Sequence, residues 1–309
     1  MLDTGKSLAS PTEDMIKEVS ASFSEPQELS KERFVALDYF NKLPLEKSTL
    51  YTKYVDILSG LTLDSFEPGL PSHIKSIPHE IAHLVRERDE PTLSLQVDSQ
   101  MVRAEVHGTL EKEGIIFSSI HSALANNPEL ARSHFTKAIP PDDDKFAALN
   151  NAFFTAGTFL YVPKGLNIKI PFRNIVLLKS RHQAAFTHNI IIAEENSKLN
   201  FLQEAYSKLD SGQQGPALYS EVTEVYVGDD AEVNFASLQN FEGDVHSTLN
   251  RRCVAQKDAR MNWTVGHIGG GTTRSRVESV LNGPGAAAED VEIVFGSESQ
   301  RVEIGRAHV

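Results

Sequence analysis

The chain has 309 residues, 40% of them hydrophobic, and carries 30 Lys and Arg against 42 Asp and Glu, a net charge of −12. This acidic balance argues against a nucleic-acid binder, which must neutralise phosphates with basic side chains. No stretch reaches roughly 18 apolar residues and the first residues carry no apolar signal core, so we expect a cytoplasmic protein without a membrane span. The single cysteine, Cys253, excludes an internal disulfide or a multi-thiolate metal site within one chain.

Residues 1–92 have a helical pattern and are expected to form an N-terminal domain. Ser10-Pro11-Thr12-Glu13 is a typical helix start, and apolar residues follow it at helical spacing. We predict a second helix over Leu29–Leu43 and a third around His79–Arg88. Asp89-Glu90-Pro91 breaks the pattern, and we place the domain boundary there.

Strand-forming residues dominate from residue 93 onwards. The segments SLQVDSQMVRAEV and EGIIFSS predict the first strands, and helices are predicted over Ser119–Phe135 and Phe146–Phe154. The second of these helices follows an acidic cap at Asp142–Asp144. Between Gly157 and Val302 the strand pattern is nearly unbroken.

One phrase occurs three times in this strand-rich part of the chain. Residues 193–201 read AEENSKLNF, residues 227–235 read VGDDAEVNF and residues 255–263 read AQKDARMNW. Each phrase is a polar turn followed by a strand in which apolar and polar residues alternate, so the apolar set lies on one face. The apolar positions are Leu199, Phe201, Val233, Phe235, Met261 and Trp263.

A single strand–turn–strand repeat cannot bury its apolar face alone, but stacked repeats bury it continuously. The fold class predicted from the repeats is therefore mainly β, a parallel β-helix (solenoid) over residues 93–302 that follows the helical domain. An ordinary β-sandwich with coincidental sequence similarity is the alternative.

Two motifs are candidates for chemistry. His79-Glu80-Ile81-Ala82-His83 is an HExxH string that could hold Zn²⁺ through His79 and His83, with Glu80 as the base. No third ligand follows at a suitable spacing, and the helix has a plain amphipathic face. Cys253 has the same register as Ile191 and Val225, which indicates a buried thiol, although Arg251 and Arg252 nearby could favour a thiolate.

Residues 144–173, DKFAALNNAFFTAGTFLYVPKGLNIKIPFR, resemble the SufB/SufD family of iron–sulfur cluster assembly proteins. The sequences EGIIFSSIHSA at 113–123 and RRCVAQKDARMNWTVG at 251–266 are also similar, and the second is closer to the D-type subunit (SufD) than to the B-type. The resemblance extends from about Phe34 to Val302.

The resemblance implies a helical N-terminal domain, a right-handed parallel β-helix and a C-terminal helical domain. It implies a cytoplasmic SUF complex with a B-type paralogue (SufB) and the ABC-type ATPase SufC, on which a cluster is assembled. It leaves flavin binding open. The family's C-terminal third, which includes the helical domain that contacts the ATPase, has no counterpart here, and EIGRAHV resembles a translated sequencing adapter. We therefore expect residues 303–309 to be non-native and the natural sequence to continue beyond Val302.

Three functional hypotheses follow. The first is a non-catalytic scaffold subunit of iron–sulfur cluster assembly, in which a lone Cys253 cannot hold a cluster and a partner must supply ligands. The second is a zinc-dependent hydrolase that uses the HEIAH string. The third is a solenoid that acts only as a binding surface.

Overall fold

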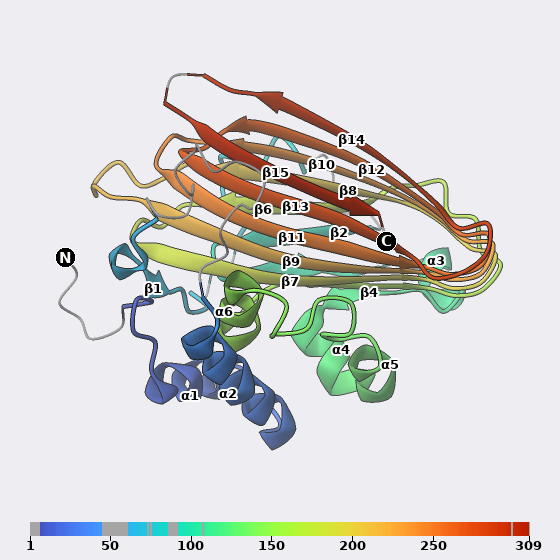
Figure 1. Ribbon diagram of the computed structural model, residues 1–309, viewed down its shortest axis with the longest axis horizontal. Coiled ribbons are helices and arrows are strands. Elements are labelled where there is room, and N and C mark those ends of the chain that lie inside the picture. The colour runs from blue at the N-terminus through green and yellow to red at the C-terminus, as the bar shows by residue number, and fades with distance from the viewer. Residues whose placement is uncertain are drawn as a thin grey trace.

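The computed structural model describes residues 7–44, 61–72, 74, 76–85, 92–106, 108–297 and 299–308. It is mainly β, with helices near the N-terminus and two sheets of mostly parallel strands. Figure 1 shows most of the helices gathered on one side of the strands. No helix in the described part of the chain is both long and apolar enough to cross a membrane.

The helices begin at recognisable caps. Helix α1 (Glu13–Ser22) follows Thr12, whose hydroxyl accepts a hydrogen bond from the Met15 N–H. Asp144 caps α6 (Lys145–Phe153) in the same way. The other helical elements are α2 (Gln27–Lys42), a 3₁₀ turn at Leu63–Ser65, α3 (Thr109–Lys112), α4 (Ile120–Asn126) and α5 (Pro128–Arg132).

Two expected helices differ from the observed ones. The helix predicted over Ser119–Phe135 is split into α4 and α5, because Pro128 cannot donate a helical hydrogen bond and begins a new helix instead. The helix predicted over His79–Arg88 is wrong for residues 79–85, which form turns, and residues 86–88 lie outside the described ones.

The chain alternates between the two sheets. Sheet A has the order β15-β13-β11-β9-β7-β5-β4, and sheet B has the order β14-β12-β10-β8-β6-β2-β3. The pairs β2–β3 and β4–β5 are antiparallel, and the other pairs in these orders are parallel. In sheet A the strands are β4 (Ile116–Ser119), β5 (Thr158–Val162), β7 (Gln183–Ala193), β9 (Ala217–Val227), β11 (Val245–Ala255), β13 (Thr272–Leu281) and β15 (Arg301–His308), with β1 (Glu67–Pro68) paired to β7. In sheet B they are β2 (Leu93–Val97), β3 (Gln100–Ala104), β6 (Phe172–Leu178), β8 (Lys198–Ser207), β10 (Glu232–Phe241), β12 (Arg260–Gly269) and β14 (Ala287–Phe295).

The three similar phrases stack in register, as predicted. Val233 of β10 lies between Leu199 and Met261, and Phe235 lies between Phe201 and Trp263. All of these residues are buried, and the ring of Phe235 is 5.3 Å from that of Phe201 and 5.0 Å from that of Trp263. The apolar face predicted from the alternation therefore points into the space between the sheets, which we call the interior.

The Asn and the turn residues of each phrase also have physical roles. Asn262 donates to Asn234 at 2.8 Å and Asn234 donates to Asn200 at 3.1 Å, so the repeated Asn forms a ladder on the outer face of sheet B. The turns before the strands contain Asn196, Asp230 and Asp258 at φ values of 57°, 57° and 54°. Asn and Asp tolerate this left-handed conformation better than most side chains.

Strand β14 departs from the pattern of its neighbours. Its pairing with β12 places Asp290 beside Trp263 and Glu292 beside Val265, on the interior side. Val291, Ile293 and Phe295 consequently lie on the outer face, where they are 43%, 60% and 70% exposed. The segment AAEDVEIVF lacks the aliphatic–Asn–aromatic ending, so the alternation has the opposite phase in this strand.

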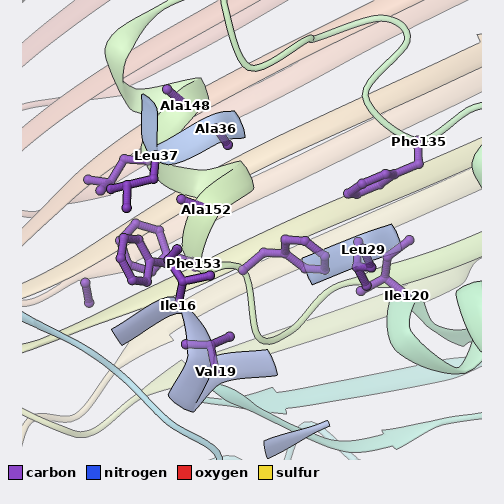
Figure 2. Packing of buried hydrophobic residues seen from close by; sticks show 14 of the residues in the cluster. Ile16, Val19, Leu29, Ala36, Leu37, Ile120, Phe135, Ala148, Ala152 and Phe153 are labelled. Atoms are coloured by element: carbon purple, nitrogen blue, oxygen red, sulfur yellow. The ribbon is translucent and has the colours of Figure 1, made fainter. Parts of the chain in front are cut away.

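The helices are packed against the outer face of sheet A by one apolar cluster (Figure 2). Ile16, Leu29 and Leu37 from α1 and α2 contribute to it, together with Ala148, Ala152 and Phe153 from α6. Phe186, Ile190 and Leu218 supply the sheet side of the same cluster. The interior cluster is separate and contains the apolar residues of the three repeats.

Candidate functional site

Cys253, the predicted candidate thiol, lies on the interior side of β11. It is fully buried and pairs with Val225 of β9 and Ser279 of β13. Ile191 of β7 pairs in turn with Val225. The prediction that Ile191, Val225 and Cys253 share one register is therefore confirmed. The thiol therefore belongs to the apolar interior cluster rather than to the protein surface.

Burial raises the pKa of the Cys253 thiol to about 11, and the negative charge of Asp290 adds to this effect. A hydrogen bond with Ser279 acts in the opposite direction but is too weak to compensate. At neutral pH the thiol is protonated, and a protonated thiol is a poor nucleophile and a poor metal ligand.

The two arginines beside Cys253 do not activate it. Arg251 points into the interior and donates to Glu221 of β9 at 2.8 Å. Arg252 lies on the opposite face of β11, where it forms ion pairs with Asp143 and Glu278. Each guanidinium is therefore occupied by carboxylates.

The Arg251–Glu221 pair is the centre of a buried polar network. The Glu221 carboxylate accepts hydrogen bonds from Gln203 and Tyr219, each at 2.8 Å, and from Thr223 at 3.0 Å. Burial is the largest influence and would raise the pKa of Glu221, but the charge of Arg251 and the hydrogen bonds from Arg251, Tyr219 and Thr223 together outweigh it, and the net shift is downward. The pair is thus ionised, and the Glu221 carboxylate is well hydrogen-bonded, the condition under which a buried charge is tolerated, whereas Arg251 Nη1 has no partner among the described residues.

A second buried pair lies at the last strands. His267 of β12 is 2.9 Å from the Glu292 carboxylate of β14, measured from Nε2 to Oε1. Such a pair could relay a proton or supply ligands to a cation, but a metal site requires further ligands. Among the described residues, no three His, Cys, Asp or Glu side chains are grouped so that they could hold a metal ion.

The HEIAH string does not have the geometry that the zinc hypothesis requires. Residues 79–85 form turns, so His79 and His83 do not share a helix face, and both are exposed. The Glu80 carboxylate pairs with Lys179 at 2.6 Å, and Ile81 packs with the apolar residues of β2 and β6.

Glu221, Gln203 and the His267–Glu292 pair were not identified from the sequence. Glu221 and Arg251 have the parity of buried residues in their strands, which marks them as inward-facing. Their pairing across 30 residues of sequence depends on the strand register, and no local pattern reveals it.

Comparisons with known proteins cover almost the entire described fold. Residues 14–173 match the model of the SufBD protein N-terminal region, and residues 176–307 match that of the SUF system FeS cluster assembly SufBD core domain. An iron–sulfur cluster assembly SufBD family protein of Staphylococcus epidermidis is 30% identical over 308 residues, covering 95% of this chain and 64% of the relative. The iron–sulfur cluster assembly protein SufB of Bacillus subtilis is 27% identical with the same coverage. The chain thus spans 64% of the length of these relatives.

Proposed function

Because the chain belongs to the SufBD family of iron–sulfur cluster assembly proteins, we propose that it is a non-catalytic scaffold subunit of the SUF system. The family match across both the helical part and the sheets carries this proposal. The nascent cluster is the cargo of such a complex. We propose that it is assembled in the cytoplasm for transfer to other proteins.

The buried and protonated state of Cys253 supports the proposal that this chain does not itself supply a thiolate ligand to the cluster. Iron–sulfur clusters are held by several thiolates, whereas this chain has one thiol, which is buried and protonated at neutral pH. A partner chain would therefore supply the cluster ligands, and we propose a B-type paralogue (SufB) in that role. The ATPase SufC is the other proposed partner.

The arrangement of the strands supports a parallel β-helix as the scaffold, and the family resemblance implies that it is right-handed. The chain passes alternately between sheets A and B, and each strand pairs with the second strand before it in the sequence from β7 onwards. We propose domain limits at residues 1–92 for the helical part and 93–302 for the β-helix. The helical part is anchored on sheet A through Phe186 and Ile190, so it would hold its orientation relative to the scaffold.

We assign the chain to the D-type, because the segment at residues 251–266 resembles that subunit. Two cavities formed by described residues do not suit a flavin. The larger, of about 720 Å³, is lined mainly by charged and polar side chains such as Lys179, Arg181, Glu242 and Asp244. The smaller holds about 190 Å³. A flavin ring requires a predominantly apolar site of several hundred Å³.

Co-expression with a SufB and a SufC tests the proposal. The tagged chain should retain SufB, and iron–sulfur reconstitution should give the cluster absorption only when SufB is present. Reconstitution of Cys253→Ala with SufB should give the same cluster content as the unsubstituted chain. Cluster formation on the isolated chain, or failure to retain SufB, would contradict the scaffold role, and the second result would favour a solenoid with another binding function.

A further inference from the structure

The loop between β8 and β9, residues 208–216, has an exposed tip that is fastened to the start of β7. The loop also forms one wall of the polar cavity of about 720 Å³. Arg181 donates to the carbonyl oxygens of Asp210, at 2.9 Å, and of Gly215. The neighbouring His182 contacts the carbonyl oxygen of Gln214. The tip of the loop, beyond Asp210, is thus held by two adjacent side chains at the start of β7.

His182 has an unusual pair of partners. Its Nε2 lies 2.6 Å from the carbonyl oxygen of Gln214, and its Nδ1 lies 3.2 Å from the carbonyl oxygen of Ser65. Ser65 ends the 3₁₀ turn that precedes β1, so the ring connects two segments that are far apart in the sequence. Gly215 permits the close approach of the loop, because a Cβ at this position would lie 2.1 Å from His182 Nε2.

The two acceptors determine which form of the His182 ring fits between them. A carbonyl oxygen can only accept a hydrogen bond, so both ring nitrogens must donate. A neutral imidazole has one N–H and points the lone pair of its other nitrogen at an oxygen, whereas the imidazolium cation has two N–H groups. Only the cation satisfies both carbonyl oxygens at the observed distances.

The charges around the ring also favour the cation. Acids outnumber bases in the segments that pack around His182, which carry Asp64, Glu67, Lys208, Asp210, Glu242 and Asp244. Arg181 opposes this effect, but it is paired with Asp244 at 2.7 Å. His246 contacts Phe66 in the same region, and burial lowers the pKa of His246, so it adds no positive charge at neutral pH.

We propose that His182 is a pH-sensitive clip that, when its ring is protonated, joins the β8–β9 loop and the segment before β1 to the start of β7. Deprotonation removes one of the two hydrogen bonds and weakens the other, since a bond from a charged donor is roughly twice as strong as a neutral one. The closed loop is therefore favoured at low pH and loosens as the ring loses its proton. The segment that contains Ser65 keeps its main-chain pairing with β7, so the loosening occurs at the loop and opens the polar cavity. The clip is independent of the scaffold function proposed above.

Nitrogen-15 NMR of the histidine side chains in the 309-residue chain tests the protonation state directly. His182 should keep two protonated ring nitrogens to a higher pH than His83, which is exposed and serves as the internal reference. Loss of the second proton at the same pH as in His83, or at a lower pH, would overturn the proposal.

Hydrogen–deuterium exchange of residues 211–215, corrected for the intrinsic pH dependence of exchange, measures the effect on the loop. The loop should be about fivefold more protected at about pH 6 than at about pH 8, the equivalent of a hydrogen bond that loses its charge. His182→Asn, which cannot take up a proton, should show equal protection at both pH values, whereas His83→Asn should behave like the unsubstituted chain. The proposal is wrong if the unsubstituted loop is equally protected at both pH values, or if the pH dependence survives in His182→Asn. Both the NMR and the exchange of the unsubstituted chain remain decisive if His182→Asn does not fold.

Discussion

Cys253 and Glu25 are both buried acids, yet their surroundings move their pKa values in opposite directions. Burial raises the pKa of the Cys253 thiol to about 11, because the hydrogen bonds that support the thiolate, from Ser279 and from the main chain, do not compensate for the loss of solvent. Burial would also raise the pKa of Glu25, but hydrogen bonds from His121 and Arg33 outweigh it and lower this pKa to about 2. At neutral pH the protein therefore holds a neutral thiol in the interior and a charged carboxylate among the helices.

We predict that Cys253 reacts slowly with a thiol reagent in the folded protein. The reagent requires both access and a thiolate, and the structure supplies neither at pH 7. Labelling in denaturant should be complete at least about a hundredfold sooner, because unfolding exposes the thiol and returns its pKa to its ordinary range. Equal rates in the two states would contradict the buried position.

Replacement of Glu25 tests its ion pair with Arg33, which connects the turn between α1 and α2 to the rest of the helices. Arg33 donates to Glu25 at 2.8 and 2.5 Å and also to the carbonyl oxygens of Ala152 and Phe154. Because the folded pKa lies below the ordinary value of 4.5, the carboxylate stabilises the fold above pH 4.5, and this contribution is lost as the pH falls towards 2.

Glu25→Gln should therefore lower the free energy of unfolding at pH 7 by about 3 kcal/mol, and the difference from the unsubstituted chain should shrink between pH 4.5 and 2. Urea unfolding at several pH values measures this. The control is Glu32→Gln, which breaks a more exposed pair with Arg132 and should cost less than about 1 kcal/mol. A pH-independent difference would show that Glu25 is not ionised in the fold.

At the scale of elements, the strands of the repeats are stabilised by their aromatic stack. Phe235 of β10 contacts Phe201 on one side and Trp263 on the other, and all three are almost fully buried. Phe295 of β14 has the same chemistry two strands away in the same sheet, but it lies on the outer face. The two residues therefore form a matched pair that differs in burial.

Phe235→Ala should destabilise the protein by about 3–5 kcal/mol, because it leaves a cavity in the stack. Phe295→Ala should change the free energy of unfolding by less than about 1 kcal/mol, because its ring is already 70% exposed. Denaturant unfolding of both variants gives the comparison. Similar losses in the two variants would mean that the stacked phrases do not face the interior.

The elements that could be predicted are those whose signal is local. Alternation fixed the inward face of β8, β10 and β12, and side-chain caps marked the starts of α1 and α6. The turns at residues 79–85 could not be predicted, because the helical spacing of the segment carries no information on its contact with Lys179, about 100 residues further along the chain. The interior ion pair of Arg251 and Glu221 could not be predicted for the same reason, because the two residues are 30 positions apart in the sequence.

On the scale of the whole molecule, charge and apolar surface act against one another. The net charge of −12 keeps copies of the chain apart, whereas the outer face of β14 presents Val291, Ile293 and Phe295 to solvent. In the described residues, β14 and β15 each pair with a neighbour on one side only, and open strand edges favour association.

Added salt should therefore promote self-association of this chain, because it screens the repulsion over a Debye length of roughly 8–10 Å but leaves the apolar contact intact. Sedimentation velocity at low and high salt measures the effect. The double variant Ile293→Lys, Phe295→Lys should remain monomeric at both. Its added lysines make the net charge less negative, which alone would favour association, so a monomeric variant would identify the apolar face as the cause. Association of the double variant at the same salt concentration would instead place the contact elsewhere on the molecule.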